Sequence, residues 1–108
     1  MPTTALWHRV CDATDLAEDG RLAARIKGQS ILLIKRLGEV YALENHCPHL
    51  GCALTRGVLE GFYLSCPCHD WRFDIRTGAF EYAPEIALVT YPTKIEEDSI
   101  YVLLKEAE

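Results

Sequence analysis

The sequence lacks the features that mark membrane-spanning, nucleic-acid-binding and secreted proteins. Its apolar runs, such as residues 31–34, are far too short to span a bilayer, and residues 1–10 hold no basic segment followed by an apolar one, as a secretion signal would. The formal net charge is −5, without the dense Lys/Arg run that phosphate contacts require. We therefore expect a soluble, cytoplasmic protein with no membrane span and no nucleic-acid partner.

Signs of several domains are also missing. We find no internal repeat, no low-complexity segment and no linker rich in Pro, Gly or Ser. A chain of 108 residues, 49% of them hydrophobic, suits one compact core and leaves no length for a separate catalytic domain. We expect a single domain over residues 1–108.

The pattern that is present is one of short strands. No stretch shows sustained helical periodicity, although residues 12–17 could form one short helical turn. Segments rich in Val, Ile, Leu and aromatic residues alternate with turn residues, so we predict an all-β protein. The expected strands are residues 5–10, 22–27, 30–36, 39–44, 62–65, 71–75, 87–91, 93–96 and 100–104, with turns at 35–39, 76–78 and 97–98.

Four of the five cysteines fall within residues 47–68, and without a secretion signal this clustering favours metal binding over a disulfide framework. Two blocks, Cys47-Pro48-His49 and Cys66-Pro67-Cys68-His69, each offer a thiolate and an imidazole. Two cysteines and two histidines also suit zinc, but structural zinc sites usually separate paired donors by two to four residues. One residue separates Cys47 from His49, so zinc is the second candidate metal, and a zinc-binding interaction module is an alternative function.

The two blocks resemble the motif of the Rieske family, C-x-H followed by C-x-x-H. The resemblance implies an antiparallel β-sandwich framework with a small cluster-binding lobe inserted at about residues 45–84. It further implies one [2Fe–2S] cluster, with Cys47 and Cys66 on one iron and His49 and His69 on the other. Flanking residues that agree are Gly51, Trp71-Arg72-Phe73-Asp74, Thr77-Gly78 and Pro84.

Mixed ligation has an electrostatic consequence. Two ferric ions, two sulfides and two thiolates sum to neutrality, so the oxidised cluster accepts an electron more easily than an all-cysteine cluster, at about −150 to +300 mV. Trp71 and Phe73 stand where the high-potential branch has hydroxyl donors, so we expect a midpoint toward the lower end. Gly51 permits a tight turn of the backbone, and Asp70 beside His69 either tolerates a left-handed turn or disfavours reduction through its charge.

Cys52 and Cys68 are open to two interpretations, either two small buried thiols or a bridged pair. In the cytochrome-complex branch of the family, cysteines at these positions are bridged, whereas ferredoxins of bacterial ring-hydroxylating dioxygenases usually lack both. We expect a disulfide that joins the two ligand blocks.

The resemblance implies an electron-transfer component and not an enzyme, because four protein ligands saturate the cluster and leave no open metal position. We expect a ferredoxin that passes single electrons from a flavin-containing reductase to a terminal oxygenase or a related oxidoreductase. The alternative within the family is a small non-catalytic subunit of a larger oxidoreductase, such as a nitrite reductase. His46 is expected to be an exposed loop residue, and Glu96-Glu97-Asp98 a solvated turn.

Overall fold

The computed structural model describes residues 3–46, 52–68 and 71–107. The regular structure in these residues is β-strand except for two 3₁₀ turns, η1 (Ala13–Asp15) and η2 (Leu54–Arg56), which confirms the predicted all-β class. The strands in chain order are β1 (Thr3–Asp12), β2 (Arg21–Ile26), β3 (Gln29–Arg36), β4 (Glu39–Glu44), β5 (Val58–Glu60), β6 (Tyr63–Ser65), β7 (Arg72–Asp74), β8 (Thr90–Tyr91), β9 (Thr93–Glu96) and β10 (Ser99–Ala107).

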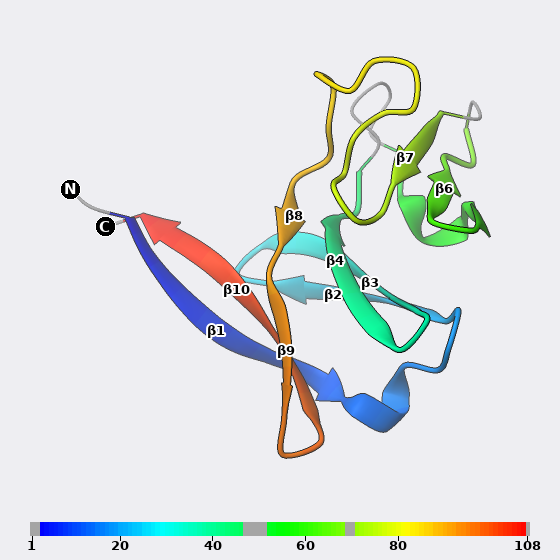
Figure 1. Ribbon diagram of the computed structural model, residues 1–108. Helices are drawn as coiled ribbons and strands as arrows, with labels where there is room; N and C mark the ends of the chain where they lie inside the picture. The colour runs from blue at the N-terminus through cyan, green and yellow to red at the C-terminus, as the bar shows by residue number, and fades with distance from the viewer. Residues whose placement is uncertain (1–2, 47–51, 69–70, 108) are drawn as a thin grey trace.

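Two antiparallel sheets form the framework, one in the order β1-β10-β9 and the other in the order β2-β3-β4-β8 (Figure 1). Three of its hairpins have two-residue turns in which both residues have positive φ: Lys27-Gly28, Leu37-Gly38 and Glu97-Asp98. Such turns match the right-handed twist of paired strands. The turn expected at residues 35–39 therefore narrows to two residues, and the one expected at 97–98 is confirmed.

Strand β3 contains the uninterrupted aliphatic run of residues 31–34 because it is buried on both faces. Ile31 and Leu33 point into a core between the two framework sheets, together with Ile100, Val102 and Leu104 of β10. Leu32 and Ile34 point the other way, into a second core that includes Leu43, Leu54, Leu64, Cys66, Phe73, Ile75 and Leu88. One strand thus packs against two different parts of the molecule.

The second core is covered by a third sheet, β5-β6-β7, which the chain builds between β4 and β8. Figure 1 shows this sheet on the side of the molecule away from the paired ends of β1 and β10. It lies inside the expected insert of residues 45–84 and includes one strand, β5, that sequence reasoning missed. With only Leu59 between two exposed residues, β5 is too short to show alternation.

Strand β8 is shorter than predicted. Only Thr90–Tyr91 pairs with β4, whereas Ala87 forms an isolated bridge with Ala79. The backbone N–H of Val89 instead donates to the Glu44 carboxylate at 2.9 Å.

In the part of the chain that the structure describes, no helix is long and apolar enough to cross a membrane.

Candidate metal centre

Of the four predicted ligands, the structure describes Cys66. Cys47, His49 and His69 lie outside the described residues, as do Gly51 and Asp70. No group of three or more potential metal-binding side chains occurs within the described ranges. The described part of the candidate centre consists of Cys66 and of the residues that flank the two ligand blocks.

The second block lies in the connection between the antiparallel strands β6 and β7. Cys66 directly follows β6, is only 1% exposed and packs in the second core. Its backbone N–H donates to the carbonyl of Trp71 at 2.7 Å, one residue before β7 begins. This hydrogen bond extends the β6–β7 ladder and closes the base of the loop that contains Pro67, Cys68 and His69.

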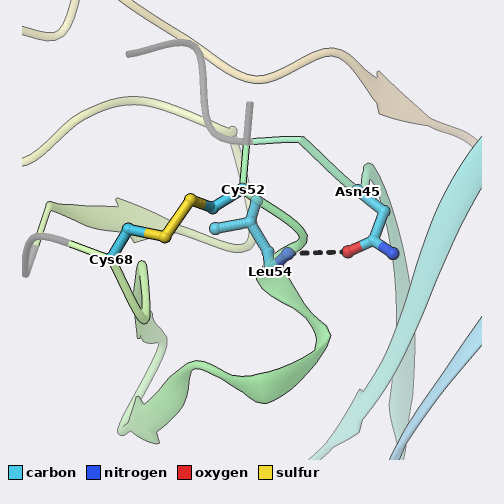
Figure 2. Close-up of a disulfide and its surroundings, with 4 residues drawn as sticks. All are labelled: Asn45, Cys52, Leu54 and Cys68. Atoms are coloured by element: carbon cyan, nitrogen blue, oxygen red, sulfur yellow. Dashed lines mark hydrogen bonds between the residues drawn. A yellow bond between two sulfur atoms is a disulfide. The ribbon is translucent and has the colours of Figure 1, made fainter. Parts of the chain in front are cut away.

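The side chain of Asn45 links the two ends of the segment that contains the first block, and Figure 2 shows its hydrogen bond with Leu54. Its Oδ1 accepts hydrogen bonds from the backbone N–H of Leu54 at 2.8 Å, and from the N–H and hydroxyl of Thr55 at 3.1 Å each. Asn45 comes two residues before Cys47, and Leu54 comes five residues after His49. The carboxamide thus joins the two ends of the segment that carries these ligands.

A disulfide joins the two blocks to each other (Figure 2). Cys52 and Cys68 are bridged, with Cα atoms 6.5 Å apart, which confirms the predicted bridge. Cys52 lies three residues after His49, and Cys68 immediately precedes His69. The covalent bond therefore links the segment that follows the first block to the second block itself.

These surroundings fit a [2Fe–2S] cluster. Two thiolates and two imidazoles are the donor set of a Rieske centre, and the bridge joins Cys52, three residues after His49, to Cys68, the residue before His69. Leu54 and Phe73 are fully buried in the second core, and Trp71 packs at its edge. An apolar wall of this kind limits access of solvent to one side of a metal centre.

Aromatic rings stiffen the chain after the second block. Trp71 stacks on Phe80 with ring centroids 4.2 Å apart, and Phe80 also contacts Phe73 at 5.7 Å. Gly78 allows the intervening turn, because it has a φ of 84° and a Cβ there would collide with the Leu88 carbonyl. Sequence reasoning named Trp71 and Phe73 but missed Phe80, since a lone aromatic residue in a loop gives no pattern.

Two arginines form hydrogen bonds with residues of the lobe, one from the framework and one from the turn after β7. Arg21 on β2 donates to the carbonyls of Thr55, at 3.2 Å, and of Gly57. Arg76 forms two hydrogen bonds with the carboxylate of Asp74, at 2.9 and 3.0 Å. Burial raises the pKa of Asp74, but the hydrogen bonds and charge of Arg76 outweigh burial and hold that pKa below its usual value.

The remaining singled-out residues match their expected roles. His46 is exposed, as predicted for a loop residue, and residues 96–98 are exposed around the β9–β10 turn. Asn45 was not predicted as a site residue. The signal that could have found it is a polar side chain at the end of the apolar strand at 39–44, two residues before a ligand.

Comparisons with known proteins agree with this geometry. The Rieske [2Fe–2S] domain model matches residues 6–92. The ferredoxin component of the naphthalene 1,2-dioxygenase system of Pseudomonas putida is 36% identical over 94 residues, which cover 86% of this chain and 90% of that protein. The anthranilate 1,2-dioxygenase ferredoxin subunit of Burkholderia cepacia is 35% identical over 102 residues, covering 93% and 94%.

A solved structure resembles most of the chain. The ferredoxin of carbazole 1,9a-dioxygenase from Nocardioides aromaticivorans IC177 superimposes with a TM-score of 0.82 and 28% sequence identity, over 89% of this chain and 95% of that one. The match therefore extends over both the framework sheets and the lobe. By sequence and by fold, the chain belongs to the Rieske [2Fe–2S] domain family.

Proposed function

We propose that Cys47, His49, Cys66 and His69 hold one [2Fe–2S] cluster, and that the protein uses it to pass single electrons from a flavin-containing reductase to an oxygenase. The observation that supports this most directly is the disulfide between Cys52 and Cys68, which joins the two ligand blocks beside their histidines. When bound, the cluster supplies a reversible one-electron couple.

The protein's own residues then have simple tasks. The Cys66–Trp71 hydrogen bond and the Asn45 carboxamide hold the two ligand loops at their bases, and the bridge holds the loops to each other. Because Phe73 is buried and has no hydroxyl, it adds no hydrogen bond to a cluster sulfur. We therefore propose a midpoint potential toward the lower end of the Rieske range of about −150 to +300 mV.

The relatives point to the partners. Proteins matched over nine-tenths or more of their length are named ferredoxin components of naphthalene and anthranilate 1,2-dioxygenase systems. We propose that this chain likewise serves an oxygenase that acts on an aromatic substrate. The net charge of −5 suits docking to partner surfaces with a basic character, because opposite charges accelerate association.

A reconstituted electron-transfer assay tests the proposal. Purified reductase and oxygenase of a naphthalene dioxygenase system are mixed with NADH and with this protein, and substrate oxidation is followed. We expect turnover only when the protein is present, and none with His69→Ala. The matched control is His46→Ala, an exposed histidine one residue before Cys47, which should retain activity.

Two outcomes separate the parts of the proposal. An iron-loaded protein that the reductase reduces but that no oxygenase oxidises would refute the oxygenase as acceptor and leave the cluster assignment standing. A wild-type protein that takes up zinc but no iron would refute the cluster itself.

We further propose that residues 1–108 fold as one domain, with the cluster-binding lobe at about 45–84, and that the protein acts in the cytoplasm. The β3 strand supports the first point, because its two faces contribute to both cores. Fractionation of cells of the source organism, with an antibody to this chain, tests the location.

A further inference from the structure

We propose that Asn45 is a positioning residue for the metal centre: its carboxamide oxygen fixes the base of the first ligand loop, so that the loop retains its ligands even when the Cys52–Cys68 bridge is open. This inference rests on the proposed function, because it assumes that Cys47 and His49 are ligands. It adds a residue that the ligand motif does not contain.

The first step of the argument is burial. Asn45 is 5% exposed and is the buried polar residue among the described residues, whose buried side chains are otherwise apolar. A buried amide is stable only when its hydrogen bonds are made, because water cannot replace them. Asn45 satisfies this condition through one oxygen that accepts three hydrogen bonds.

The second step is the direction of these contacts. Toward the loop, Oδ1 binds the backbone of Leu54 and Thr55 and the Thr55 hydroxyl. Toward the framework, the backbone N–H of Asn45 donates to the Ser30 carbonyl at 3.0 Å, and Nδ2 donates to the Ser30 hydroxyl at 3.3 Å. Asn45 therefore connects the start of β3 to the far end of the ligand loop.

The third step compares Asn45 with the disulfide. The bridge links Cys52 to Cys68 and so ties one ligand block to the other. The carboxamide links residue 45 to residues 54 and 55 and so closes one block on itself. Because the two links restrain different pairs of segments, loss of the bridge leaves the first loop closed. A reducing environment can therefore open the bridge without releasing the cluster.

The chain offers variants that separate loop closure from framework contacts. Asn45→Ala removes both sets of side-chain contacts and leaves three donors of residues 54 and 55 without their acceptor. Asn45→Asp keeps an oxygen to accept those three hydrogen bonds, and the Ser30 hydroxyl can turn to donate to its second oxygen. Ser30→Ala removes only the contact of Nδ2 with the framework.

The test measures iron release to an excess of a chelator, by absorbance, at a temperature where far-UV circular dichroism shows the framework folded. Each variant is made in the wild-type chain and in Cys52→Ser/Cys68→Ser, which has no bridge. In the bridgeless chain, Asn45→Ala should release iron at least about tenfold faster, in line with the effect of removing residues that orient metal ligands. Asn45→Asp and Ser30→Ala should stay within about threefold of the bridgeless parent, because the loop-closing oxygen is retained.

A spectroscopic measurement adds a readout that framework stability would not move. We expect the reduced-state EPR line shape of bridgeless Asn45→Ala to broaden relative to its parent, because a loop that is open at its base holds its ligands in several arrangements. Equal release rates and equal spectra for Asn45→Ala and its parent would overturn the proposal, as would Asn45→Asp releasing iron as fast as Asn45→Ala. If the wild-type chain binds no two-iron cluster, it is the proposed function that fails.

Discussion

Different interactions stabilise the framework and the cluster-binding lobe. Most framework strands have six to ten residues, and the framework has two-residue turns and a core of mainly aliphatic side chains between its two sheets, such as Leu33 and Val102. The lobe sheet has three strands of three residues each; it packs on β3 through the second core, and particular polar or covalent links hold the segments around it. Those links are the Asn45 carboxamide, the Arg21 guanidinium and the Cys52–Cys68 bridge.

The two kinds of interaction differ in how strictly they fix the positions of the residues they join. Burial of apolar surface is non-directional, so the framework tolerates small shifts, and its stability follows from packed volume. Hydrogen bonds and a disulfide have defined geometry, so they fix Asn45 to Leu54 and Cys52 to Cys68 in particular arrangements. A metal centre that needs four ligands in fixed positions benefits from the second kind of construction.

The largest expected effect comes from the framework core. Leu33 is fully buried between the two sheets, so Leu33→Ala should lower the free energy of unfolding by about 2–5 kcal/mol through lost burial and a cavity. Urea unfolding of the iron-free protein measures this change in the free energy of unfolding. The matched control is Val58→Ala on the lobe edge, where Val58 is 60% exposed, and its effect should be within about 0.5 kcal/mol. Equal effects of the two changes would contradict the comparison.

The next effect sharpens the comparison by acting on the lobe alone. Removing the bridge with Cys52→Ser/Cys68→Ser frees a segment with a sequence separation of 16, a change worth up to about 3 kcal/mol of local stability. Hydrogen exchange of the iron-free protein should show lost protection for β6 and β7, with β3 and β4 unchanged. Equal loss of protection in all four strands would mean that the two regions unfold as one.

The smallest effect is a dependence on pH within the lobe. Arg76 lowers the pKa of Asp74, so the carboxylate stabilises the fold fully above its unfolded pKa of about 3.9, and this contribution is lost as the pH falls through the lower folded value. Asp74→Asn should therefore destabilise the iron-free protein at pH 6, and the difference from wild type should shrink between pH 4 and the acid limit.

Arg76→Gln provides the control for that prediction, because it removes the same ion pair from the other side. It should destabilise at pH 6 and converge with wild type in the same acid window. A difference between wild type and Asp74→Asn that stays constant down to the acid limit would show that the pair does not link proton binding to folding.

Much of the framework could be predicted from sequence, because its strands are long enough to show composition and its turns contain glycine or paired acids. Residues 39–44 are an example, since the expected strand and β4 coincide. The lobe strands were harder. Val58–Glu60 pairs with β6 through tertiary contacts, and its three residues cannot establish a period.

One feature of the candidate site could be predicted from the sequence, and another could not. The bridge between Cys52 and Cys68 followed from a resemblance in the motif, and the structure confirms it. The role of Asn45 could not be predicted, because its partners Leu54 and Thr55 lie nine and ten residues away in an irregular segment. Only the folded chain shows that a polar residue just after β4 accepts hydrogen bonds from Leu54 and Thr55.

The most direct test of the account is pulsed EPR on the reduced protein, purified with iron, together with its iron and sulfide content. The account predicts two iron and two sulfide per chain and hyperfine coupling to the ¹⁴N nuclei of two imidazoles, one from His49 and one from His69. In His69→Ala the coupling should fall to one imidazole, or the cluster should not assemble. A colourless protein with one zinc per chain, or a cluster signal without nitrogen coupling, would contradict the account.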